Sequence, residues 1–166
     1  QTLDTYIDFM CPICNQFEQV YGPQMTQLRD DGTITQNVHP IAILNRVSNG
    51  TNYSTRAANA MYAVVVADYD KSHDFMQAMF ANQPAEQSSG LTDEQILGVA
   101  EAVGITVTDE LRADVEDQRY ATFVNYMTAK TPIQPGQTKI GTPTIAVNGE
   151  VLASSQIPNE LATLFE

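Results

Sequence analysis

The chain has little positive charge, little cysteine, no tryptophan and no long apolar run. Only 8 of its 166 residues are Lys or Arg, against 20 Asp or Glu, and the net charge is −12. Because so few cations cannot neutralise a run of phosphates, nucleic acid is excluded as a partner. No run of about eighteen uncharged apolar residues occurs, so the sequence predicts a globular chain without a membrane span.

The chain has only two cysteines, and both lie in one motif, Cys11-Pro12-Ile13-Cys14. A framework of several disulfides is therefore excluded. A purely structural disulfide is disfavoured, because a loop this short constrains the unfolded chain little. A zinc site is disfavoured too, since the only histidines, His39 and His73, lack the spacing of a zinc motif. Redox chemistry of the dithiol is the favoured interpretation, and it needs neither metal nor cofactor.

The N-terminal part of the chain predicts a strand, a helix and a second strand. Residues 5–9 suit a strand with one core face, and Cys11 follows at once. From Cys14 onward apolar residues recur at helical spacing, so the cysteine pair opens an amphipathic helix. Residues 33–44 predict the second strand, and Pro40 within it indicates a sheet edge or a bulge.

A helical block is predicted for residues 54–129. Ser54 is expected to cap its first helix, and Thr92 with Gln95 predicts a capping box at a later one. The last helix of the block is expected to run from residue 108 to about residue 129. This arrangement favours an all-α unit between the two halves of a core.

The C-terminal part predicts a hairpin followed by a short helix. Residues 142–147 suit a strand, Asn148-Gly149 a type I′ turn, and residues 150–152 the returning strand. Pro158 is expected to start the last helix. A strand that follows a long helical crossover is expected to be parallel, which implies an α/β core.

The fold class predicted from this order is α/β: a core with an inserted all-α helical subdomain. Residues 1–53 and 130–166 would form the core, and residues 54–129 the helical insertion. At this length the chain fits one domain, or a core with a sizeable insertion.

A C-x-x-C motif at a strand-to-helix junction has specific chemistry. If Cys11 is the N-cap and Pro12 the first helical residue, the Cys11 sulfur faces free backbone N–H groups and the positive end of the helix dipole. Its thiolate is stabilised there. Cys14 lies one turn further in and is more shielded, so we expect Cys11 to attack substrates and Cys14 to resolve the mixed disulfide.

Three features form a joint pattern over nearly the whole chain: residues 8–14, Gly141-Thr142-Pro143-Thr144 before a late strand, and the helical block between them. With this pattern the sequence resembles the DsbA-like family of thioredoxin-fold oxidoreductases, and the resemblance implies a thioredoxin-like core with the helical subdomain inserted in it. In that family the proline matching Pro143 is cis and faces the cysteine pair. The residue matching Thr142 holds an extended substrate strand by backbone pairing. The resemblance therefore implies that Thr142 and Pro143 bind substrate.

Two departures from the family pattern leave the oxidising strength open. Ile13 stands where DsbA proper carries a histidine that stabilises the thiolate. Thr5 stands where thioredoxin-like relatives place a buried acid, six residues before the first cysteine. Asp8 is the nearest acid that could assist proton transfer, although a solvated or hydrogen-bonded acid near a turn is the favoured interpretation.

The leading hypothesis is an enzyme that oxidises cysteine pairs of exported proteins through Cys11 and Cys14. Its partners would be unfolded or partly folded exported polypeptides and a membrane redox partner that resets the disulfide. The alternatives are a disulfide reductase or isomerase of the same compartment, and a non-catalytic peptide-binding module. The expected location is extracytoplasmic: periplasm, cell envelope or secreted. Because the chain starts at Gln1 without Met, we expect an N-terminal signal or anchor absent from it.

Overall fold

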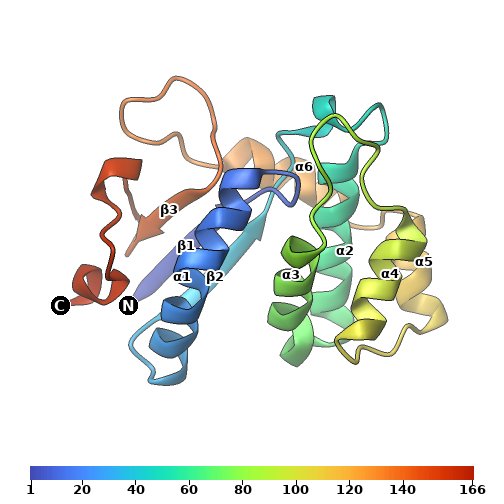
Figure 1. Ribbon diagram of the computed structural model, residues 1–166, viewed down its shortest axis with the longest axis horizontal. Helices are drawn as coiled ribbons and strands as arrows, with labels where there is room; N and C mark the ends of the chain where they lie inside the picture. The colour runs from blue at the N-terminus through green and yellow to red at the C-terminus, as the bar shows by residue number, and fades with distance from the viewer.

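A four-stranded sheet with the strand order β2-β1-β3-β4 organises one half of the molecule. The computed structural model describes residues 1–166. Figure 1 shows this half beside a helical half, with α1 lying across the sheet. The mixed architecture confirms the predicted fold class, a thioredoxin core with a helical insertion. No helix combines the length and the apolar composition needed to cross a membrane.

The first three elements form the predicted strand-helix-strand unit. Strand β1 (Thr2–Ile7) leads into helix α1 (Pro12–Asp30), and the chain returns in β2 (Thr35–Pro40). The two strands are parallel, with Thr2 opposite Thr35 and Ile7 opposite Pro40. Strand β2 is shorter than predicted and lies at the sheet edge, where Pro40 ends it because it has no N–H to donate.

The prediction of a parallel strand after the helical block is wrong. Strand β3 (Thr144–Val147) runs antiparallel to β1, with Thr144 opposite Tyr6. The chain therefore enters β3 at the end of the sheet where β1 leads into Cys11. An antiparallel entry is what brings the loop before β3 next to the cysteine pair.

The predicted hairpin is confirmed. Strand β4 (Glu150–Val151) pairs with β3, and Asn148 and Gly149 both have positive φ, as a type I′ turn requires. The last helix starts later than predicted: it is a 3-10 helix over Leu161–Phe165.

The other half of the molecule is helical. Its helices are α2 (Tyr53–Ala67), α3 (Ser72–Ala81), α4 (Asp93–Ala102), α5 (Asp109–Glu116) and α6 (Ala121–Lys130). Figure 1 shows α2 to α5 packed together beside the sheet half, and α2 contacts α3, α4, α5 and α6. The capping box of Thr92 and Gln95 is present at α4, as predicted. The division into residues 1–53 with 130–166 and residues 54–129 stays a prediction, and α6 contacts both α2 and β2.

The single helix predicted for residues 108–129 is wrong, because the chain breaks between α5 and α6. Gln118 has a φ of 50°, a left-handed conformation that interrupts a helix. The buried Asn59 side chain stabilises the break: its Nδ2 donates to the Asp114 carbonyl at 3.1 Å, and its Oδ1 accepts from the Tyr120 N–H at 2.7 Å. A long-range contact thus replaces local helical bonds.

Ser54 does not cap α2, contrary to the prediction. The helix begins two residues earlier than such a cap implies, at Tyr53, and its N-cap is Asn52 with a φ of 52°. The Ser54 hydroxyl instead donates to Asp8 Oδ1 at 2.8 Å. A fully buried carboxylate needs such donors, and that need outweighs helix capping here.

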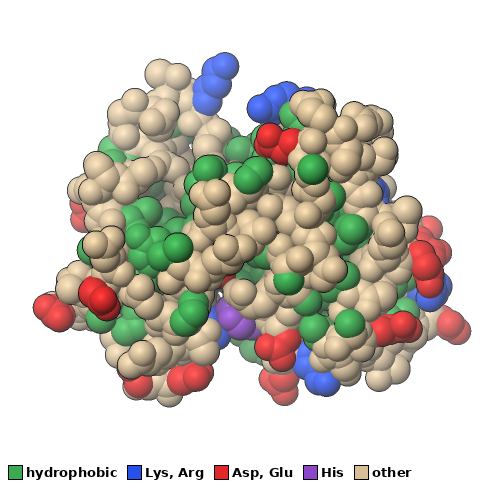
Figure 2. All heavy atoms as spheres, viewed as in Figure 1, with side chains coloured by type: hydrophobic (Ala, Val, Ile, Leu, Met, Phe, Trp, Pro, Cys, Tyr) green, Lys and Arg blue, Asp and Glu red, His purple; other side chains and the backbone are tan.

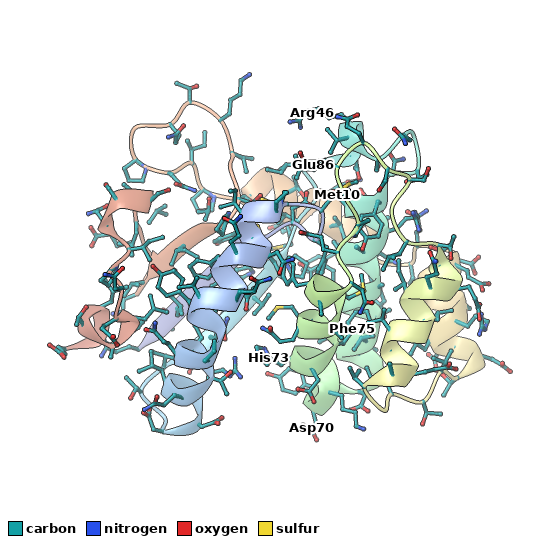
Figure 3. The ribbon with its side chains drawn as sticks, viewed as in Figure 1. Met10, Arg46, Asp70, His73, Phe75 and Glu86 are labelled. Atoms are coloured by element: carbon teal, nitrogen blue, oxygen red, sulfur yellow. The ribbon has the colours of Figure 1, made fainter.

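The larger of two hydrophobic clusters joins both halves. It contains Ile7, Phe9, Met10 and both cysteines together with the inner faces of α2 to α5. Figure 3 shows Met10 at the N-terminal end of α1, close to the helical half. The strand-to-helix junction that carries the dithiol is therefore anchored in the shared core.

Candidate active site

Cys11 occupies the N-cap of α1, and Pro12 is the first helical residue, as predicted. The Cys11 backbone is extended, with φ −78° and ψ 115°, and its side chain makes no capping bond of its own. The sulfur instead faces the backbone N–H groups of Ile13 and Cys14. These are donors that a helix start leaves without intrahelical partners.

These surroundings lower the pKa of Cys11 to about 6. The largest cause is a hydrogen bond from the Cys14 thiol, and burial opposes it. The Thr142 side chain and the N–H groups of Cys14 and Ile13 lower the pKa further. Dipoles and neutral donors therefore supply the thiolate stabilisation that Ile13 cannot supply as a side chain.

Cys14 has the opposite character. Its side chain is fully buried, and burial raises its pKa well above the usual value, with the neighbouring Cys11 adding to the rise. Cys11 is 6% exposed, and both thiols are free. The pair thus consists of an acidic, reachable thiol and a shielded one.

The structure brings Thr142 and Pro143 to the cysteine pair from the other end of the sequence. The Cys11 thiol donates to the Thr142 carbonyl, with the sulfur 3.4 Å from the oxygen. The Thr142-Pro143 bond is cis, the isomer that the family resemblance implies. Gln134, which nothing in the local sequence marks, holds this loop: its Nε2 donates to the Pro143 carbonyl at 2.8 Å.

Asp8 is a hydrogen-bonded structural acid, which confirms the favoured interpretation. One carboxylate oxygen accepts from the Met10 N–H and from Ser54 Oγ, and the other accepts from the N–H groups of Ile43 and Leu44. Burial raises its pKa and these bonds oppose the rise. Asp8 therefore fixes the cysteine junction to the chain after β2 and to α2.

Neither histidine contacts the cysteine pair. His39 stacks on Tyr6 in the sheet, with 4.4 Å between ring centroids, and lies 2.9 Å from Asp4 Oδ1. His73 lies on α3 beside Arg29. No three His, Cys, Asp or Glu side chains gather in a way that could hold a metal ion.

A groove opens beside the dithiol, between α1 and the loop that leads into β3. Its volume is about 570 Å³, and it is lined on the α1 side by Ile13, Phe17, Val20 and Tyr21, and on the loop side by Ile140 and Pro143. Figure 2 shows hydrophobic side chains gathered on this face between α1 and the C-terminal segment. Ile13 is 56% exposed at its edge, so this apolar surface is available to a partner.

The sequence analysis missed a buried carboxyl further along α1, that of Glu18. Glu18 is 2% exposed, its Oε2 accepts from Gln77 Nε2 of α3 at 2.9 Å, and its Oε1 has no partner. Burial raises its pKa to about 7, against smaller opposing effects of Gln77 and Arg29. Its helical position alone did not distinguish it from a solvent-exposed acid.

The family model described as thioredoxin matches residues 1–166. This chain belongs to the thioredoxin family. Within it the chain is DsbA-like. The reduced DsbA of Mycobacterium tuberculosis superimposes with a TM-score of 0.79 and 30% identity, covering 92% of this chain and 74% of that one. The reduced DsbG from the same organism superimposes with a TM-score of 0.79 and is 29% identical, and the match covers 90% of this chain and 69% of DsbG.

The curated relatives that match are much longer proteins. The serine/threonine-protein kinase PknE of Mycobacterium tuberculosis is 31% identical over 111 residues, which is 64% of this chain and 20% of the kinase. The match therefore spans about one fifth of that relative. BdbD from Bacillus subtilis, at 22% identity and a TM-score of 0.78, shares the fold.

Proposed function

We propose that this DsbA-like chain is a thiol-disulfide oxidoreductase that oxidises cysteine pairs of exported proteins. The observation that carries the proposal is the contrast within the dithiol. Cys11 lies at a helix N-cap with its pKa lowered to about 6, whereas Cys14 is fully buried with a raised pKa. A low pKa makes Cys11 both a good nucleophile near neutral pH and a good leaving group.

In the oxidising direction, a substrate thiolate attacks Cys11 Sγ of the Cys11-Cys14 disulfide. The new bond joins the substrate sulfur to Cys11, and Cys14 leaves as a thiolate that takes up a proton. A second substrate thiolate then attacks the substrate sulfur of this mixed disulfide. The substrate disulfide forms, Cys11 leaves as the stabilised thiolate, and two electrons remain on the dithiol.

Thr142 and Pro143 form the substrate-binding part of the proposal. An extended substrate segment would pair with the Thr142 backbone, beside the Cys11 sulfur. The short distance from Cys11 Sγ to the Thr142 carbonyl supports this placement. The groove that Ile13 and Pro143 line would take apolar side chains, which unfolded chains expose and folded ones bury.

The proposed compartment is extracytoplasmic, because protein disulfides form and persist outside the reducing cytosol. The substrates would be unfolded or partly folded exported polypeptides. Each turnover leaves the dithiol reduced, so a redox partner must reoxidise it, and a membrane protein is the proposed partner. No nucleic acid is proposed as a partner, because a net charge of −12 repels its phosphates.

The test is multiple-turnover oxidation of a reduced two-cysteine peptide in a glutathione buffer. The protein is expected to oxidise the peptide faster than glutathione disulfide does alone. Faster reduction than oxidation would make the chain a reductase or isomerase. Binding of the peptide without turnover would make it a binding module.

A further inference from the structure

One side chain of the helical half contacts the backbone that carries the nucleophile. Gln83 follows the end of α3, and its single amide nitrogen donates to the carbonyls of Phe9 at 3.0 Å and Cys11 at 2.9 Å. In Figure 1 the loop after α3 passes beside the N-terminal end of α1. Both hydrogens of the amide are thus directed at the strand-to-helix junction.

The orientation of this amide is fixed by a second amide. Asn15 Nδ2, in the first turn of α1, donates to Gln83 Oε1 at 3.2 Å and to the Phe80 carbonyl at 3.0 Å. Asn15 Oδ1 in turn accepts from Gln19 Nε2 at 3.1 Å. If Gln83 were flipped, its oxygen would face two carbonyls and its nitrogen would face a donor. Only one orientation satisfies all of these groups.

We propose that Gln83 is a positioning residue for Cys11: it holds the N-cap backbone so that the Cys11 sulfur faces the helix N–H groups, and through it the helical half tunes the thiolate. The proposal rests on the proposed function only in taking Cys11 as the nucleophile. Gln83 makes no hydrogen bond to the reacting sulfur, and its effect passes through the Cys11 and Phe9 carbonyls.

An effect of Gln83 on the Cys11 pKa is measurable because no ion pair near Cys11 masks it. None of the ion pairs of the protein includes a residue from 9–15 or 80–83, so neutral dipoles act on Cys11 from this side. The titratable group that faces Cys11 is the Cys14 thiol, and the Asp8 carboxylate accepts from four other donors. Gln83 makes no hydrogen bond to either group. The Cys11 carbonyl has one other bond, from the Asn15 N–H at 3.2 Å, so Gln83 supplies its shorter contact.

The test is the Cys11 pKa in Gln83→Met, followed by thiolate absorbance during a pH titration of the reduced protein. Met keeps the length of the side chain and removes both donors. The pKa is expected to rise by about half a unit, the scale of one dipole at a helix end, so the thiolate fraction at pH 6 falls about twofold. The equilibrium constant against glutathione at pH 7 is expected to shift about threefold toward the disulfide.

Asn82→Ala is the matched control. Asn82 is adjacent, is exposed, and donates only to the Ala78 carbonyl of its own helix. Its loss loosens the end of α3 without reaching Cys11, so the Cys11 pKa should stay unchanged. An equal shift in both variants, or none in a Gln83→Met protein that melts like the wild type, would overturn the proposal.

Asn15→Ala keeps the proposal testable if Gln83→Met does not fold. It removes the donor that orients Gln83, so the Cys11 pKa should rise in the same direction, and no rise would contradict the proposal. Where both single variants fold, their effects should be less than additive in the double variant. The titration needs no substrate, so its outcome is separate from failure of the peptide oxidation assay.

Discussion

Reduced Cys14→Ser is expected to form a persistent mixed disulfide with a disulfide substrate, whereas Cys11→Ser is expected to form almost none. With its pKa at about 6, Cys11 is mostly thiolate at pH 7, but a buried thiol with a raised pKa is less than about 1% ionised there. The Cys14→Ser variant should therefore react at least several-fold faster. The larger thiolate fraction of Cys11 outweighs the lower nucleophilicity that its low pKa brings, and Cys14 is shielded by burial. Mass spectrometry of the adduct after a timed quench measures both rates.

The pH dependence of this trapping tests the cause of the low pKa. The rate with Cys14→Ser should be half-maximal near pH 6, because the serine hydroxyl can replace the Cys14 thiol as a donor to the Cys11 sulfur. Cys14→Ala removes that donor, which is the largest cause of the lowered pKa, so its profile should move to higher pH. Faster trapping by Cys11→Ser than by Cys14→Ser would reverse the roles assigned to the two cysteines.

Glu18→Gln is expected to stabilise the protein at alkaline pH and to have much less effect in acid. Folding raises the pKa of Glu18 from its ordinary value of 4.5 to about 7, so the folded state favours the neutral carboxyl. That favourable contribution is complete below the unfolded pKa and is lost as the pH rises through 7. Between pH 5 and pH 8 the wild type therefore loses roughly 2 to 3 kcal/mol that the glutamine variant keeps.

Urea unfolding of the oxidised proteins at pH 5 and pH 8 measures this difference, because the disulfide form removes the titration of both cysteines. Any cost of burying the amide nitrogen where Glu18 Oε1 has no partner is the same at both pH values and cancels. Glu101→Gln, at an exposed position of α4, is the control and should change little with pH. A Glu18→Gln stability gain that is equal at pH 5 and pH 8 would show that Glu18 is ionised throughout.

Sequence patterns predicted those features that depend only on residues close together in the sequence. The dithiol at a helix start, the capping box at Thr92 and the turn at Asn148 each need only a few neighbouring residues, and all three are present. Pro40 predicted a sheet edge or a bulge because it lacks a donor, and β2 is an edge strand. The family resemblance added the approach of Thr142 to Cys11, which no spacing along the chain implies.

Two of the misses, the break before α6 and the missing cap at Ser54, share a different cause, which is a buried polar group with a distant partner. Asn59 ends α5 from another helix, and Asp8 takes the Ser54 hydroxyl away from its cap. Gln83 and Glu18 carry no motif, and their importance follows only from which distant groups face them. Sequence spacing does not contain these contacts, because each forms only when elements that are distant in the sequence pack together.

The reduction potential of the Cys11-Cys14 couple, from equilibrium with glutathione at pH 7, tests the central claim most directly. A stabilised Cys11 thiolate favours the reduced form, so the couple should lie clearly above the value of thioredoxin, about −270 mV. Ile13 in place of histidine makes this a demanding test, since only backbone and neutral donors support the thiolate. A potential at or below about −270 mV, the value of thioredoxin, would contradict the proposed oxidase.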